Sequence, residues 1–147
     1  MSWLNLSDDL RRLEQTSWET EWLTSDKPIH PALLMVFVDS ARDLPFPKMN
    51  LEPSPWVEVA LGDVVQRTPM KPKSTNPVYQ TKFLFFTKEP EAKELRLKAV
   101  DDGTRRELGE LTIPLASVMR EPRMEVYQQT FHLALGVHSS PIVLTLR

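Results

Sequence analysis

The sequence predicts an all-β domain, an eight-stranded antiparallel β-sandwich preceded by a short N-terminal helical linker. Short apolar runs with partial period-two alternation recur between residues 32 and 147, at the spacing expected of an antiparallel sandwich. Thirteen prolines against four glycines fall between these runs, where a missing N–H and a fixed φ end a strand. A chain of 147 residues with 41% hydrophobic content buries about 70% of its unfolded surface, so we expect one compact domain.

Eight runs predict the strands, and turn residues bound most of them. They cover residues 32–38, 56–61, 64–70, 79–86, 94–100, 107–113, 127–133 and 142–146. Four aromatic residues fall at inward positions of these runs and are expected in the core, namely Tyr79, Phe83, Phe85 and Phe131.

Two stretches predict helix. The first begins at Ser7, whose hydroxyl can cap the turns that hold Leu10 and Leu13, and it is too short to be stable alone. The second, at 115–119, lies between Pro114 and Pro122 and is expected to form one or two connecting turns.

Residues 1–31 form a leader that differs from residues 32–147, the predicted domain. The leader has six acidic and three basic residues, a charge of −3, whereas the domain has fourteen and fifteen, a charge of +1. Trp3, Trp18 and Trp22 would expose a large apolar area in a flexible linker, so we expect the leader to dock. Both its own sandwich and a neighbouring domain remain open as the docking surface.

Composition excludes several classes of function. A net charge of −2 argues against nucleic acid as a partner, and the absence of cysteine excludes disulfides, thiol nucleophiles and cysteine metal sites. No apolar run approaches the roughly 20 residues of a membrane-spanning helix, so membrane contact is expected to be peripheral. No nucleophile elbow, phosphate loop or carboxylate pair is present, so we expect neither catalysis nor a cofactor, and the histidines receive no role.

Four motifs, in order, resemble a C2 domain. Residues 32–45 resemble its opening strand and first loop, and Pro53-Ser54-Pro55-Trp56-Val57 stands where the family has Asp-Pro-Tyr-Val. Residues 74–79, followed by Phe83 and Phe85, resemble its Thr-x-Asn-Pro-x-Trp turn, and Leu108-Gly109-Glu110 resembles the strand after the third loop. The resemblance covers residues 32–147.

Within that family the chain resembles the second C2 module of extended synaptotagmins. Trp3-Leu4-Asn5-Leu6 is similar to the end of a preceding C2 unit, and residues 10–13 to the linker between units. The resemblance implies a circularly permuted (type II) topology and a tether, anchored in the endoplasmic reticulum, that contacts the plasma membrane and moves glycerolipids. A separate domain would carry the lipid, and this module would lie on the cytoplasmic side as a spacer, docking or membrane-binding unit.

The resemblance also implies a calcium site, and here the chain departs from the family. Calcium takes six to eight oxygen ligands, which C2 domains draw from aspartates in the first loop, at the Asp-Pro position and in the third loop. Lys48 and Ser54 stand at two of those positions, and Asp101 alone matches in the third loop, where Gly103 follows. We therefore predict no metal and a calcium-independent module.

Further features of the loops leave alternatives open. Arg105 and Arg106 add two positive charges to a third loop that is shorter than in calcium-binding versions. Asp101 and Asp102 are either a weak ligand pair or solvated turn formers. The positive charge of Lys48 either takes the place of the calcium ion and holds the loop together, or has no such role.

Basic side chains predict contact with an anionic phospholipid membrane. Residues 64–88 contain five basic residues and no acidic one, and Arg96 and Lys98 alternate with apolar residues on a later strand. The candidate lipid-binding residues are Arg67, Lys71, Lys73, Lys82, Arg96 and Lys98. Each contributes about 1 kcal/mol at an anionic surface, although charges on exposed strands also keep sheets soluble.

Apolar residues of the first loop are the second candidate contact. Phe46 and Met49 either enter the headgroup region of a membrane or cover the end of the sandwich. Two functions follow: a calcium-independent phospholipid-binding or spacer module, and alternatively a protein interaction module that docks an adjacent C2 domain without binding lipid. Trp3, Trp18 and Trp22 are the candidate interdomain contacts.

Overall fold

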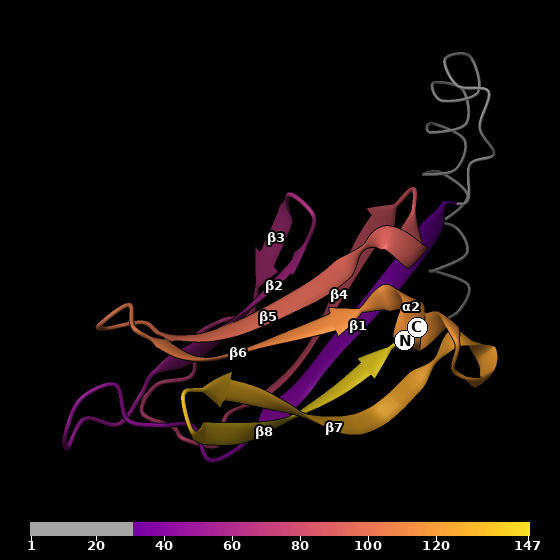
Figure 1. The fold of residues 1–147 in the computed structure, drawn as a ribbon. Coiled ribbons are helices and arrows are strands. Elements are labelled where there is room, and N and C mark those ends of the chain that lie inside the picture. Colours follow the sequence, from indigo (N-terminus) through magenta and orange to yellow (C-terminus); the bar gives the residue numbers. More distant parts are fainter. Residues whose placement is uncertain (1–30) are drawn as a thin grey trace.

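The computed structural model describes residues 31–147, which form an antiparallel β-sandwich (Figure 1). All eight predicted strands are present, and so is the short helix α2 (Leu115–Met119). The predicted leader helix and the three leader tryptophans lie outside the described residues. The strands are β1 (Ala32–Ala41), β2 (Pro55–Leu61), β3 (Val64–Arg67), β4 (Val78–Thr87), β5 (Glu94–Asp101), β6 (Glu107–Pro114), β7 (Val126–Leu135) and β8 (His138–Leu146).

Strand β3 is shorter than the predicted 64–70. It pairs with β2 only through four residues, of which Arg67 lies opposite Glu58. Pro69 follows two residues later, and proline has no N–H with which to extend a ladder. Beyond it the chain still follows β2, because Lys71 N donates to Pro55 O at 3.0 Å.

The strand order is β3-β2-β5-β6-β7-β8-β1-β4, which folds into two four-stranded layers. The layers join through a single residue pair between β6 and β7, Glu110 with Ala134. The closing strand β8 pairs with the opening strand β1, as the permuted topology requires.

The core lies between the layers, where alternate residues of each strand point inward. On β5, Leu95 and Leu97 are at most 1% exposed, whereas Arg96 between them is exposed. Tyr79, Phe83 and Phe85 are buried as predicted, and Phe131 is partly buried at the edge of the core.

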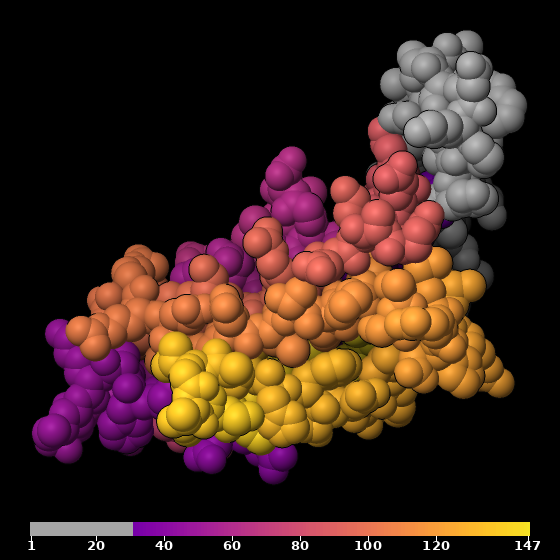
Figure 2. Space-filling model, in the orientation of Figure 1, coloured from indigo at the N-terminus to yellow at the C-terminus, as the bar shows by residue number. Residues whose placement is uncertain are grey.

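The chain connects its strands at two opposite ends. The first end, which we call the loop end, carries residues 42–54, 68–77 and 102–106 and the turn between β7 and β8. In Figure 2 the first and third of these segments project together from one extremity of the molecule. The opposite end carries the β2–β3 turn, the 3₁₀ turns η1 (Pro90–Ala92) and η2 (Pro122–Met124), and α2. Within residues 31–147 no helix has the length and apolar character needed to cross a membrane.

Candidate functional site

Asp101 organises the loop end as a hydrogen-bond acceptor. It is only 2% exposed, and its Oδ1 accepts the Ser54 N–H at 2.7 Å. Its Oδ2 accepts both the Thr104 N–H at 2.8 Å and the Thr104 hydroxyl at 2.7 Å. Burial raises the pKa of Asp101, but these hydrogen bonds outweigh it and leave the pKa below its ordinary value. Asp101 is therefore a carboxylate at neutral pH with both oxygens engaged.

Further hydrogen bonds tie the third loop to the first. Asp102 N donates to Ser54 O at 3.0 Å, and Arg106 Nη1 donates to Pro47 O at 3.0 Å across 59 residues of sequence. Lys48 is exposed, and its carbonyl accepts the Leu51 N–H at 3.2 Å. The cationic group that contacts the first loop is thus the guanidinium of Arg106, a role the sequence did not reveal.

The residues at the loop end do not fit a calcium ion. The Asp101 oxygens already accept three hydrogen bonds, and the Ser54 hydroxyl accepts the Lys73 N–H at 3.1 Å. Nowhere in the described part of the chain do three or more His, Asp or Glu side chains gather as metal ligands. The Asp102 carboxylate lies 3.5 Å from the Arg105 guanidinium, with which it forms an exposed ion pair.

Three of the candidate basic residues share the outer face of the β3-β2-β5 layer, where acidic side chains separate them. Glu58 of β2 lies opposite Arg67 on one side and Lys98 on the other, 3.9 Å from the Lys98 ammonium. The Arg67 guanidinium stacks 4.7 Å from the centre of the Trp56 ring. Arg96 projects from this same face, as the alternation predicted.

More carboxylates adjoin this face. Glu110 lies opposite Lys98, and Glu107 precedes the bulge in the same strand. Burial, a hydrogen bond to Glu110 and the charge of Glu110 raise the pKa of Glu107, which Lys98 partly offsets. We call the surface formed by Arg67, Glu58, Lys98, Glu107 and Glu110 the mixed-charge face. The signs alternate along the row Arg67, Glu58, Lys98 and Glu110, so the face is not uniformly basic.

The structure separates the other three basic residues from the mixed-charge face. Lys71 and Lys73 lie at the loop end, where their backbone N–H groups bond Pro55 O and the Ser54 hydroxyl. Lys82 lies on β4 opposite Phe37, in the other layer. The six candidate residues therefore do not share one face, because Lys82 lies on β4, which forms no ladder with β3 or β5.

The apolar residues of the first loop are exposed. Phe46 is 50% and Met49 is 90% exposed. The end of the core is instead closed by Leu44, which is 3% exposed. Exposed apolar side chains and three lysines, Lys48, Lys71 and Lys73, thus occupy the same end of the sandwich.

Comparison with known proteins agrees with this architecture. The C2 domain family model matches residues 32–133. The chain belongs to the C2 domain family. Over 149 aligned residues this C2 domain is 35% identical to extended synaptotagmin-1 of Homo sapiens, covering 99% of the chain and 13% of that protein. The chain therefore spans about an eighth of the relative it matches.

Solved structures give the same assignment. A structure of two tandem C2 domains of extended synaptotagmin 2 matches with a TM-score of 0.75 at 27% identity, covering 90% of this chain and 44% of that one. The calcium-bound form of those domains matches with a TM-score of 0.73 at 26% identity, covering 95% and 47%. This C2 domain is thus similar to modules that occur in tandem in one chain.

Proposed function

We propose that this C2 domain docks its loop end on an anionic phospholipid membrane without calcium, as a module of a tethering and lipid-transfer protein. Its similarity to extended synaptotagmins supports a place at contacts between the endoplasmic reticulum and the plasma membrane. The observation that carries the proposal is the Asp101 network, which holds two loops together by hydrogen bonds where an ion would otherwise bridge them. Phe46 and Met49 project from one of those loops.

The expected affinity is modest. Lys71 and Lys73 each contribute about 1 kcal/mol at an anionic surface. Burying the exposed parts of Phe46 and Met49 contributes about 3 kcal/mol more, at roughly 1.5–3 kcal/mol for each fully buried side chain of this kind. The sum of about 5 kcal/mol corresponds to a dissociation constant of the order of 0.1–1 mM. With this affinity the module would strengthen a membrane attachment that other domains of the protein provide.

Vesicle flotation tests the proposal. In chelator and low salt, the domain should float with vesicles rich in anionic lipid, and Lys71→Glu with Lys73→Glu should abolish flotation. Lys82→Glu is the matched control, because it reverses one lysine on a different layer and should retain most of the binding. Flotation that requires calcium, or that survives the double reversal, would contradict the proposal.

The mixed-charge face favours a second candidate function, docking of an adjacent C2 domain. Alternating charges such as Glu58 beside Lys98 suit a protein surface of matching pattern better than a uniformly anionic bilayer. The similar structures of extended synaptotagmin 2 contain two C2 domains in one chain. In this proposal Arg67, Arg96 and Lys98 contact the adjacent domain, whereas Lys71 and Lys73 contact the lipid membrane. Trp3, Trp18 and Trp22 remain the proposed interdomain contacts of the leader.

Charge reversal separates the two candidates. Arg96→Glu with Lys98→Glu should leave flotation with anionic vesicles nearly unchanged and should weaken association with the neighbouring module in the full-length protein. A loss of flotation in this variant, with the fold intact by circular dichroism, would show that Arg96 and Lys98 bind the membrane and would contradict their assignment to the interdomain surface.

A further inference from the structure

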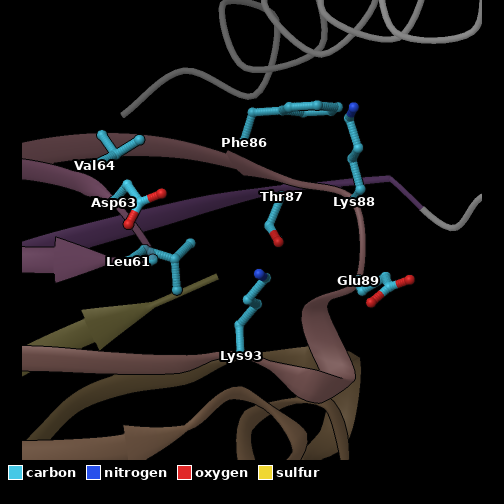
Figure 3. Close-up of a pocket in the computed structure, with 9 residues that line it drawn as sticks. Leu61, Asp63, Val64, Phe86, Thr87, Lys88, Glu89 and Lys93 are labelled. Carbon is cyan, nitrogen blue, oxygen red and sulfur yellow. The ribbon is translucent and has the colours of Figure 1, made fainter. Parts of the chain in front are cut away.

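A pocket of about 410 Å³ lies at the opposite end of the sandwich from the loops (Figure 3). The β2–β3 turn forms one wall, and the connection from β4 to β5 forms the other. Seven residues of β2, at about 3.3 Å each, separate the pocket from the loop end, a distance of about 20 Å. Its lining residues are Leu61, Gly62, Asp63, Val64, Phe86, Thr87, Lys88, Glu89 and Lys93.

The hydroxyl of Thr87 is the unusual group in this pocket. Thr87 is 6% exposed, and its Oγ1 is buried without a hydrogen-bond partner in the described part of the chain. Buried polar groups in proteins are nearly always hydrogen-bonded, so such an atom needs an explanation. Figure 3 shows the hydroxyl directed into the pocket, where the Lys93 side chain ends beside it.

The charged groups of the pocket come from different walls. Lys93 is exposed and forms no ion pair within residues 31–147. Asp63 lines the same pocket from the β2–β3 turn, and Leu61 and Phe86 supply apolar surface. The β4–β5 side of the pocket therefore presents the Thr87 hydroxyl and the Lys93 ammonium, with Lys88 and Glu89 on the same wall, and the β2–β3 side presents the Asp63 carboxylate.

We propose that this pocket binds a zwitterionic phosphodiester, the chemistry of a phosphoethanolamine headgroup. The Lys93 ammonium and the Thr87 hydroxyl would bind the phosphoryl oxygens, and Asp63 would face the amine. Inorganic phosphate fits less well, because the Asp63 carboxylate repels an anion that carries no positive group. The inference goes beyond the proposed function and does not depend on it, since the pocket and the loop end lie at opposite ends of the domain.

Titration of the full chain with soluble glycerophosphoethanolamine, followed by amide chemical shifts, tests the proposal. Shifts are expected at Asp63, Thr87 and Lys93, with at least tenfold weaker binding in both Lys93→Gln and Thr87→Val. Lys73→Gln, a lysine at the loop end, is the matched control and should bind as the parent does. Asp63→Asn should reduce the preference for glycerophosphoethanolamine over inorganic phosphate.

A second arm identifies the source of the ligand. Retention on vesicles of phosphatidylcholine and phosphatidylethanolamine, lost in Lys93→Gln, would support a bilayer lipid. Binding of the soluble diester without vesicle retention would support a free phosphodiester. Absence of shifts, unchanged affinity in both pocket variants, or equal affinity for inorganic phosphate would overturn the proposal. None of these outcomes bears on docking through the loop end, which the Lys71 and Lys73 reversals test separately.

Discussion

Replacing Asp101 with asparagine tests the claim that hydrogen bonds, without an ion, hold the loop end together. Asparagine keeps the shape of the side chain but offers one oxygen and one NH₂ group. Whichever way it turns, the NH₂ faces an N–H donor, either that of Ser54 or that of Thr104. One hydrogen bond to a charged acceptor is lost, about 1.5–3 kcal/mol, and a buried donor is left without a partner.

The expected destabilisation of Asp101→Asn is therefore about 3 kcal/mol, or a fall in Tm of about 12 °C at roughly 4 °C per kcal/mol. Urea and thermal unfolding measure it. Asp102→Asn is the matched control, because its exposed contact with Arg105 at 3.5 Å should cost at most about 0.5 kcal/mol. A loss below about 1 kcal/mol in Asp101→Asn, or a rise of several degrees in the Tm of the parent with 1 mM calcium, would refute the reasoning.

Three further predictions concern stability. The pKa of Asp101 is depressed, so the stability that its carboxylate contributes is fully present above the ordinary pKa of 3.8 and is lost as the pH falls through the folded-state pKa. The difference in unfolding free energy between the parent and Asp101→Asn, measured in urea, should therefore shrink between pH 7 and pH 2.5. A difference that stays constant would contradict this. Thr87→Val should raise the free energy of unfolding by about 1 kcal/mol, because it removes a buried hydroxyl without a partner, and a lower stability in urea would show that the hydroxyl is satisfied. Gly109→Ala should lower the stability to urea by about 1–3 kcal/mol, since its Cβ would lie 2.9 Å from Cβ of Leu133, and a neutral effect would mean that β7 yields easily.

The strands were predictable because burial on one face imposes a period of two. Arg96 between buried Leu95 and Leu97 shows the rule, and the structure confirms it. The end of β3 also had a visible cause in Pro69, although the alternation alone extended the strand past it. Local pattern thus determines which residues form strands and which side chains point inward.

The chemistry of the surfaces was less predictable, because it depends on which strands are neighbours. The sequence places Lys82 and Arg67 in one basic stretch, but the topology sends them to different layers and inserts Glu58 beside Arg67 and Lys98. The Asp101 to Ser54 hydrogen bond joins residues 47 positions apart, which no short motif encodes. The unpartnered hydroxyl of Thr87 likewise becomes visible only when the packing around it is known.

The strand order also determines how another chain can attach to this domain. Because β6 and β7 connect the layers, the continuous ladder ends only at β3 and β4, and these two borders approach each other where Gln66 contacts Leu84. The Gln66 side chain donates through Nε2 to Leu84 O at 3.0 Å, so it occupies a carbonyl that an added strand would need. Sheet borders that lack such a contact are where proteins recruit foreign strands or aggregate. A partner is thus directed away from strand addition and toward the outer faces of the two layers and the two ends of the sandwich.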